Sequence, residues 1–289
     1  MNETRKLARF VARNNYQDLP TDVVYNLKSY VLDNIAAGFV GSLQSWSTIV
    51  ADMVQAQGGK NESSIFNKSW KTDASRAALI NGVMIGAFEL EHIAYAAHPS
   101  GTVFPAALAL AERDNLNGKK FITGLALGYE VNCRVAQAQT NLAESERGFH
   151  NPSINGVFGS AAAVSKLLDL DEPGILNSLG IAGSHSAGVI EFAWEGAMTK
   201  RLHLGRAAQL GLESAFLAQR GFSGPSTILE GPYGYLQAFS PKPLVYKLLE
   251  GLGEDWLLLN TIIKSFACHL SSQGIVRQIQ DYRYKHHID

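Results

Sequence analysis

The sequence predicts an all-α fold, a large helical bundle in one domain that reaches to about residue 270. Apolar residues recur every three or four positions along most of the chain, which is the period of an amphipathic helix. Strands do not alternate with helices, and no fixed-period repeat is present. With 289 residues, 46% of them hydrophobic and 18% charged, the composition is that of a globular protein that buries a large core.

The first two helices are predicted from the spacing of apolar residues and from Pro and Gly. Leu7, Phe10 and Val11 lie at i, i+3 and i+4, so they form one face of an amphipathic helix. Pro20 opens the second helix, because proline lacks only an N–H group that the first turn leaves unpaired in any case. Gly41 ends this helix, since glycine readily adopts the left-handed conformation that follows a helix.

Later helices are predicted from long apolar stretches. They are, in chain order, Ala74–Glu91, Phe104–Arg113, Phe121–Ala138, Val157–Leu168, Pro173–Ala182 and Ala207–Gln219. Glycines recur inside them, as at Gly124 and Gly128, although each costs about 0.5–1 kcal/mol relative to alanine. We therefore expect two helices to approach closely at these small residues. The best candidate strand is the short run Ser64–Phe66.

The charge balance argues against two classes of partner. Twenty-five Lys and Arg residues and 26 Asp and Glu residues leave a formal net charge of −1. Such a chain has no electrostatic reason to bind nucleic acid or an anionic membrane. No stretch is predicted to span a membrane, because the longest uncharged run, 34–51, is interrupted by Gly, Ser and Gln.

The cysteines and the N-terminal region bear on the cellular compartment. Cys133 and Cys268 show no metal-binding spacing and are predicted to be buried thiols in a reducing compartment. The N-terminal region has no apolar core typical of a signal peptide, so a cytoplasmic location is expected. A mitochondrial address is the alternative, because the same region carries the basic residues Arg5, Lys6, Arg9 and Arg13.

Four polar clusters are not explained by a helical core, and the first of them surrounds His98. Glu89, Glu91 and His92 precede it. Glu89 and His92 would share a face if one helix contained both, whereas Glu89 and Glu91 would not. His98 lies in the loop ahead of a predicted helix that carries a proline near its start. Spacing alone therefore also allows a histidine that merely bonds to the helix backbone.

The second and third clusters are a histidine and a basic helical turn. His150 lies in a loop with Gly, Asn and Pro, and the sequence allows it either to line a cleft or to face solvent. Lys200, His203 and Arg206 follow one another at three-residue spacing, so one helix would present three basic groups together and clamp carboxylates. The alternative is a solvated helix N-terminus, although cations there oppose the helix dipole.

The fourth cluster contains His269, which follows an apolar run with Ile262 and Ile263 and precedes a predicted helix. From these residues alone, a buried structural histidine is the simplest interpretation. The chain has no Walker loop, no strand-linked GxGxxG, no HExxH and no GxSxG. Phosphoryl transfer and dinucleotide binding are therefore not expected, and no metal site is predicted.

Several segments together resemble the MmgE/PrpD family, which includes 2-methylcitrate dehydratase, cis-aconitate decarboxylase and iminodisuccinate epimerase. The resemblance runs in order along nearly the whole chain. The matching stretches are LKSYVLDNIAAGFVG from Leu27, HPSGTVFPAALALAE from His98, GYEVNCR from Gly128, GFHNPSINGVFGSAAAVSKLL from Gly148, TKRLHLG from Thr199 and GFSGPSTILEG from Gly221.

The resemblance implies a large helical domain, a smaller α+β lid domain, a homodimer and no organic cofactor. In this chain the helical domain would comprise residues 1–270. Residues 271–289 would be a short segment where the lid begins, so most of the lid is expected to be missing.

The resemblance also implies which residues line the pocket between the two domains. His98 matches the histidine of the family's HPS motif, and Lys200 and His203 match its TKxLH motif. His269 matches the histidine that opens the link to the lid. The predicted catalytic residues are therefore His98, Lys200, His269 and Glu91, and the predicted substrate-binding residues are His203, Arg206 and His150.

One departure from the family pattern concerns the acidic residues. Many family enzymes carry an Asp-Asp pair ahead of the HPS histidine, where this chain has Glu89 and Glu91. Either glutamate could replace an aspartate, but its longer side chain would shift the carboxylate by about one methylene. Such a shift is enough to change substrate geometry.

The family reactions remove a proton or carbon dioxide next to a carboxylate. Histidine supplies a base whose pKa is near neutrality, and fixed cations stabilise the charge that develops. The predicted function is a cofactor-free lyase of the dehydratase or decarboxylase type, acting on a small di- or tricarboxylate. Two alternatives remain open: an epimerase or isomerase of the same family, and a truncated, non-catalytic paralogue that acts as a dimerisation partner.

Overall fold

The fold consists almost entirely of helices packed around one main core, in a computed structural model that describes residues 2–288. The helices are α1 (Glu3–Arg13), α2 (Thr21–Gly41), α3 (Ser45–Gln57), α4 (Ala74–Ile85), α5 (Pro99–Arg113), α6 (Gly118–Gln139), α7 (Leu142–Ser145), α8 (Asn151–Leu167), α9 (Glu172–Ser184), α10 (Phe192–Glu195), α11 (Thr199–Gln219), α12 (Tyr235–Phe239) and α13 (Gln273–His286). Strands β1 (Ser63–Ser64) and β2 (Lys71–Thr72) pair antiparallel. Short 3₁₀ helices span Tyr16–Asp18, Val245–Leu248, Leu257–Asn260 and Leu270–Ser272. The predicted all-α fold is confirmed.

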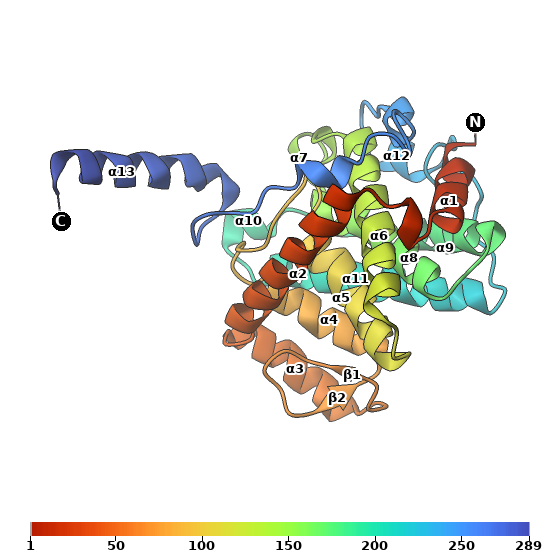
Figure 1. Cartoon of the computed structure of the whole chain (residues 1–289), viewed down its shortest axis with the longest axis horizontal. Helices are drawn as coiled ribbons and strands as arrows, with labels where there is room; N and C mark the ends of the chain where they lie inside the picture. Colours follow the sequence, from red (N-terminus) through yellow and green to blue (C-terminus); the bar gives the residue numbers. More distant parts are fainter. Residues whose placement is uncertain (1, 289) are drawn as a thin grey trace.

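Helix α8 is the central packing element of the bundle. It contacts α5, α6, α9 and α11, which surround it (Figure 1). Residues 151–165 of this helix are all buried, and they are apolar or small and polar on every face. A helix without a charged face is stable only where other helices cover it completely. The first residues of α8 therefore lie deep in the protein, next to the cavity described below.

Glycines permit the closest helix contacts. A Cβ atom added at Gly128 of α6 would lie 2.6 Å from the Cβ of Ala163 and 2.7 Å from the carbonyl oxygen of Gly159 on α8. A Cβ added at Gly82 of α4 would lie 2.7 Å from the Cα of Gly205 on α11. These distances are shorter than normal contacts between non-bonded atoms, so a side chain at either glycine would push the helices apart. The predicted close approach at small residues is confirmed at these crossings.

The predicted helix Ala74–Glu91 is too long. Helix α4 ends at Ile85, and Glu89 has a left-handed backbone with φ of 59°. Glu89 and His92 therefore do not share a helical face. Gly86, Ala87 and Glu91 beyond Ile85 are buried by tertiary contacts of a loop, which local periodicity cannot distinguish from the buried face of a helix.

Other boundaries also differ from the prediction: α8 begins at Asn151 and α11 at Thr199, six and eight residues before the predicted starts. Helix α5 begins at Pro99, five residues before the predicted start, and contains Pro105 in its interior. Helix α3 was not predicted, because the uncharged run that it shares with α2 gives no clear helical period. The predicted strand Ser64–Phe66 is found one residue earlier and shorter, at β1.

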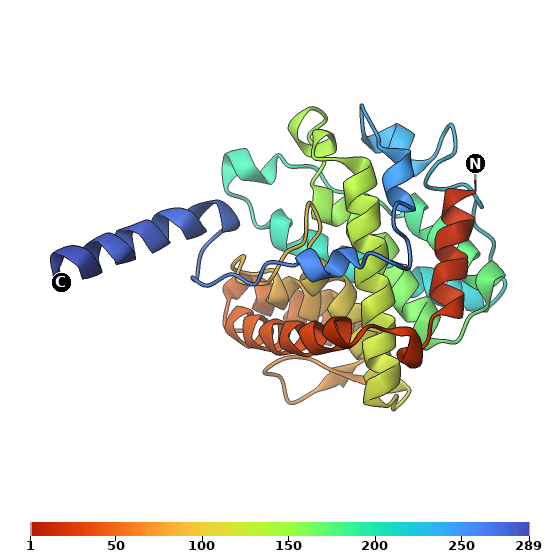
Figure 2. The same cartoon turned by 45° about the horizontal axis from the view of Figure 1, so that its top comes forward.

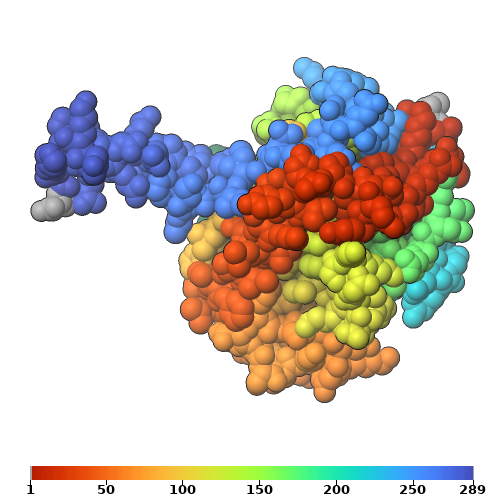
Figure 3. Space-filling view, in the orientation of Figure 1, coloured from red at the N-terminus to blue at the C-terminus, as the bar shows by residue number. Residues whose placement is uncertain are grey.

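The C-terminal helix α13 extends away from the bundle (Figures 1 and 2). None of its residues is buried, and the apolar side chains of Ile275, Ile279 and Tyr282 are exposed. The space-filling view shows the helix as an arm separate from the rounded body (Figure 3). Cys268, in the segment that leads to this arm, is only partly buried, so the prediction of two buried thiols is right for Cys133 alone.

Across residues 2–288, each helix is too short or too polar to cross a membrane.

Candidate active site

A cavity of about 760 Å³ lies where five segments of the chain meet. These segments are the loop between α4 and α5, the α7 region with the start of α8, α10 with the residues just before it, the start of α11, and the stretch before α13. Its lining residues are Glu89, Tyr95, Ala96, His98, Asn141, Glu144, Ser145, Glu146, Gly148, His150, Asn151, Pro152, Ile190, Phe192, Ala193, Trp194, Lys200 and His269. Four of the predicted site residues, His98, His150, Lys200 and His269, thus share one cavity although they lie far apart in the sequence.

Glu89 is the point on which the cations of the cavity converge. Its Oε1 lies 2.8 Å from the Nζ of Lys200, and its Oε2 lies 3.7 Å from the Nζ of Lys264 and 3.8 Å from the Nε2 of His269. Burial by itself would raise the pKa of the Glu89 carboxyl. The charges of His98, Lys200 and Lys264 and the hydrogen bond from Lys200 outweigh burial and lower this pKa to about 2. Glu89 is therefore ionised at neutral pH.

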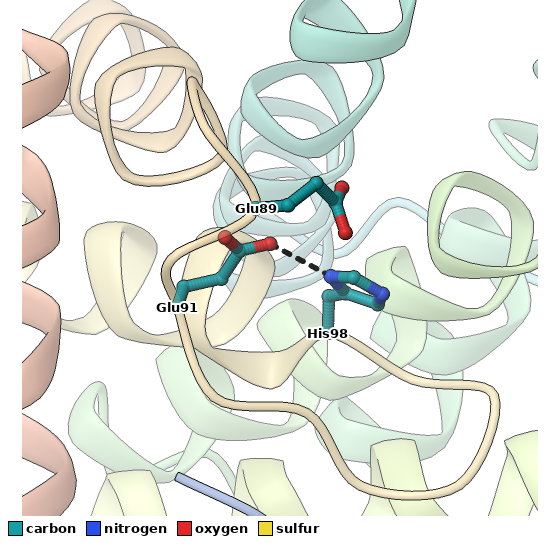
Figure 4. A group of neighbouring side chains, drawn as sticks. All are labelled: Glu89, Glu91 and His98. Atoms are coloured by element: carbon teal, nitrogen blue, oxygen red, sulfur yellow. Dashed lines mark hydrogen bonds and ion pairs between the residues drawn. The ribbon is translucent and has the colours of Figure 1, made fainter. Parts of the chain in front are cut away.

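Glu91 acts on His98 rather than on the cavity itself. The Glu91 side chain is completely buried, and its Oε1 lies 2.8 Å from the Nδ1 of His98 (Figure 4). A carboxylate in this position accepts the Nδ1–H and fixes the ring with its Nε2 unprotonated, as in other carboxylate–histidine pairs. The Nε2 of His98 has no hydrogen-bond partner within residues 2–288, and so it is free to meet a ligand.

Buried hydrogen bonds hold the loop 86–98 that carries both glutamates. The His92 ring bridges two helices: its Nδ1 lies 2.7 Å from Asp33 of α2, and its Nε2 lies 3.0 Å from the hydroxyl of Tyr129 on α6. The Ser100 hydroxyl donates to the His92 carbonyl oxygen over 2.9 Å. His92 was singled out in the sequence next to the glutamates, and here it anchors their loop without lining the cavity.

A pair of histidines, His150 and His203, lies beside the cavity. The Nδ1 of His150, the residue before α8, is 3.0 Å from the Nδ1 of His203 on α11. His150 is buried, so the interpretation that it faces solvent is wrong. Burial, reinforced by the nearby charges of His98 and Lys200, lowers the pKa of His150 well below its usual value. Burial also lowers the pKa of His203.

The three basic residues at the start of α11 do not point the same way. Lys200 lines the cavity and His203 contacts His150, but Arg206 is exposed, and its Nη1 donates to Gln209 over 2.8 Å. At 3.6 residues per turn, a side chain six positions along the helix is rotated by about 120° from the first. Each three-residue step adds to this rotation, so the three do not form one cluster, and Arg206 lies outside the cavity.

His269 lines the cavity and is not the buried structural histidine that its sequence context favoured. Its side chain is 56% exposed, and its Nδ1 lies 2.8 Å from the hydroxyl of Ser271. Lys264, five residues earlier, was not predicted. Its side chain is 1% exposed, and its Nζ donates over 2.5 Å to the Glu89 carbonyl oxygen. A single lysine among apolar residues was the available signal, because a buried ammonium group requires an anionic partner.

Donor atoms of Glu89, Glu91 and His98 lie within 4.8 Å of one another, and within residues 2–288 this is the single such group that could hold a metal ion (Figure 4). Both oxygens of Glu89, the Oε1 of Glu91 and the Nδ1 of His98 already have partners, whereas the buried Oε2 of Glu91 has no hydrogen-bond partner within residues 2–288. Lys200 and Lys264 balance the charge of Glu89, and Glu91 binds His98. A divalent cation that used the paired atoms would have to displace these partners.

Comparison with known proteins places this site in a family context. Residues 5–246 match the model of the MmgE/PrpD N-terminal domain. The chain is 31% identical to the cis-aconitate decarboxylase of Homo sapiens over 88% of its length, and 30% identical to the cis-aconitate decarboxylase-like protein oryM of Aspergillus oryzae (strain ATCC 42149 / RIB 40) over 96%. It is 28% identical to the cis-aconitate decarboxylase of Aspergillus terreus, also over 96%.

The chain spans 54–61% of the length of these three relatives. The family match nevertheless includes the segments that supply Glu89, His98, His150 and Lys200, so most of the cavity wall lies within it. A matched region of this extent identifies the chain as a member of the MmgE/PrpD family.

Proposed function

We propose that this protein is a lyase that acts on a small di- or tricarboxylate, of the decarboxylase or dehydratase type. The observation that carries the proposal is the convergence of Lys200, His98 and His269 on one cavity around the ionised Glu89. The names of the relatives, which include cis-aconitate decarboxylases, support the same reaction class.

Lys200 is the proposed site of substrate carboxylate binding. In the free protein its ammonium group binds the Glu89 carboxylate, which shows that the cavity offers this cation to an anionic oxygen. A substrate carboxylate would share Lys200 with Glu89, and the partly exposed His269 would contact a second carboxylate. Fixed cations of this kind stabilise the enolate-like charge that forms when a proton or carbon dioxide leaves the adjacent carbon.

His98 is the proposed acid–base group. Because Glu91 holds the Nδ1–H, the Nε2 of His98 can take a proton from the substrate carbon, and the buried carboxylate stabilises the resulting imidazolium. This proton abstraction serves a dehydration. In a decarboxylation no proton is taken from the substrate: His98 starts as an imidazolium protonated by solvent, the carbon–carbon bond breaks and carbon dioxide leaves, and the Nε2–H protonates the resulting carbanion, which returns His98 to its neutral form. Glu91 thereby acts through His98, and not as the independent acid–base group that its motif suggested.

The test is turnover of the purified chain with cis-aconitate and 2-methylcitrate, followed by carbon dioxide release and ultraviolet absorbance. We expect turnover of at least one of them. Lys200→Ala should lower kcat/KM by about 10²–10³-fold, the usual effect of removing one group that stabilises developing charge. Lys285→Ala on the exposed α13 is the matched control and should leave turnover unchanged. Equal rates for Lys200→Ala and wild type would refute the carboxylate clamp.

An epimerase is the second candidate, because two histidines, His98 and His150, line one cavity. Epimerisation requires one group to remove a proton and another to return it on the opposite face. Incubation of a chiral dicarboxylate in deuterated water separates the two reactions. Deuterium exchange with inversion and without loss of carbon dioxide or water would favour the epimerase.

We further propose that the protein needs no cofactor and forms a homodimer through α2. Treatment with a chelator followed by gel filtration should leave turnover unchanged. The exposed face of α2 carries the apolar side chains of Tyr25, Leu32 and Phe39 at seven-residue spacing, and Leu43 in the turn after the helix is exposed as well. Contiguous exposed apolar residues of this extent are typical of a protein interface. Light scattering should give the mass of two chains, and Leu32→Asp should convert the dimer to a monomer.

A non-catalytic dimerisation partner is the third candidate. Binding of cis-aconitate measured by calorimetry without any turnover would support it.

A further inference from the structure

His150 and His203 form a pair whose ring nitrogens face each other. Their Nδ1 atoms are 3.0 Å apart, and the Phe192 ring packs against both imidazoles with centroid distances of 5.1 Å and 5.6 Å. The two rings come from different elements, the residue before α8 and the first part of α11. Their contact is therefore produced by tertiary packing.

The hydrogen bond between the two Nδ1 atoms couples the tautomers of the rings. A neutral imidazole carries a proton on one nitrogen and a lone pair on the other, so one ring must donate through Nδ1 and the other must accept. The ring that donates through Nδ1 keeps the lone pair on its Nε2. The Nε2 of His150 has no hydrogen-bond partner among the described residues, and it is the nitrogen that this ring can offer to a ligand in the cavity.

The charges around His150 decide the direction of this hydrogen bond. The ring is buried and lines the same cavity as Lys200, whose ammonium group is a fixed positive charge, and the negative charge of Glu89 only partly offsets the positive surroundings of the ring. A positive environment disfavours a charged His150, and it favours a lone pair over an N–H on the nitrogen that is not bound to His203.

We propose that His203 is a positioning residue whose Nδ1 accepts the Nδ1–H of His150, so that His150 stays neutral and presents the lone pair of its Nε2 to the substrate. This lone pair can accept a hydrogen bond from a substrate hydroxyl or protonated carboxyl group. If His150 takes a proton there, its Nδ1–H still donates to His203, so the pair keeps its geometry while the ring becomes charged. The proposal deepens the function given above, and only its kinetic arm rests on that function.

Nuclear magnetic resonance of ¹⁵N-histidine-labelled protein tests the tautomer directly and requires no turnover. Long-range proton–nitrogen correlations at pH 7 show which ring nitrogen carries the proton, and the His150→Gln spectrum assigns the signals. We expect the His150 proton on Nδ1. His203→Asn, whose amide oxygen can accept the same hydrogen bond, should retain this tautomer, and His203→Leu should lose it. A proton on Nε2 in the wild type, or an unchanged tautomer in His203→Leu, would overturn the proposal.

The kinetic arm uses the same two variants. His203→Leu should lower kcat by about 10–100-fold, the size of effect seen when the partner that orients a functional imidazole is removed. KM should change less than threefold, and His203→Asn should stay within about fivefold of wild type. His286→Asn on α13 is the control and should match wild type. Equal losses in the Leu and Asn variants would mean that His203 only fills space, and that result would refute the positioning role.

Discussion

Two histidines of the cavity, His98 and His150, differ in the residue that each ring binds. His98 binds the carboxylate of a fully buried Glu91, whereas His150 binds a second imidazole, His203. A carboxylate stabilises the charged form of a histidine, and a neutral imidazole in a buried, positive environment does not. The same side chain therefore has an anionic partner at one position and an imidazole partner at the other.

Two histidines in one cavity can therefore have separate chemical roles, because their partners differ. Assignments of acid and base in active sites commonly follow from pairs of titratable groups whose surroundings favour opposite protonation states. Here the surroundings are set by the loop before α5 for one ring and by the contact of α8 with α11 for the other. The predictions below test this contrast, in decreasing order of expected effect.

Removing the His98 ring should have the largest effect. His98→Gln eliminates the proposed proton acceptor but retains a polar side chain of similar size, so kcat/KM should fall by about 10³-fold. Carbon dioxide release measures the loss, and circular dichroism should show an unchanged helix content. A decrease of less than tenfold would contradict the acid–base role of His98.

Removing the charge of Glu91, the partner of His98, should have a smaller effect. Glu91→Gln leaves the ring in place but can stabilise the wrong tautomer and no longer stabilises an imidazolium, so kcat should fall by about 10–100-fold. Glu254→Gln, at an exposed position, provides the control and should behave as wild type. If Glu91→Gln is fully active, the carboxylate only fills a space behind His98.

The neutral state of His150 should appear as a dependence of stability on pH. In the unfolded chain this histidine becomes charged below its ordinary pKa of 6.5, while the lowered pKa in the folded protein keeps it neutral. The unfolded state then binds more protons than the folded state. As far as His150 is concerned, the free energy of unfolding is therefore highest above pH 6.5 and decreases as the pH falls below 6.5. The loss between pH 6.5 and 5 is at most about 2 kcal/mol.

Urea unfolding at pH 7 and pH 5 measures this change, with His150→Gln as the comparison. The variant should show a shallower decrease of unfolding free energy, because the residue that resists protonation is absent. The same slope in both proteins would show that His150 is not held neutral.

The smallest effect should follow from Arg206→Ala. Arg206 is exposed, and within residues 2–288 its side chain has one hydrogen bond, to Gln209, so kcat/KM should change less than twofold and stability by less than about 0.5 kcal/mol. Steady-state kinetics and thermal unfolding provide the measurements. A tenfold rise in KM would place Arg206 at the substrate after all.

Sequence patterns predicted the site best where a residue lies inside a matched motif. His98, Lys200 and His269 were selected as matches to family motifs, and the fold brings all three to one cavity. The polar, Gly-rich context of His150 left its exposure undecided, because a loop residue can be buried only by elements distant in sequence. Their catalytic and binding roles, and the division of the chain at residue 270, remain predictions.

The central role of Glu89 and the presence of Lys264 could not be predicted from local pattern. The prediction placed Glu89 on a helix, but that helix ends four residues earlier, at Ile85. Glu89 instead has a left-handed backbone, in a loop that hydrogen bonds anchor to α2 and α6. Lys264 lies 175 residues away in the sequence and meets Glu89 only in the folded chain. Ion pairs between such distant residues depend on tertiary geometry and leave no period in the sequence.

The sequence by itself determined that this protein is an all-α bundle of the MmgE/PrpD family, because apolar period, glycine positions and short motifs act locally or along single helices. Only the tertiary structure decided that Glu91 binds His98, that His150 contacts His203 and that Arg206 is exposed. Each of these outcomes depends on where one element lies relative to another. Burial and charge pairing, which set the chemistry of a side chain, arise from contacts between segments that the linear sequence keeps apart.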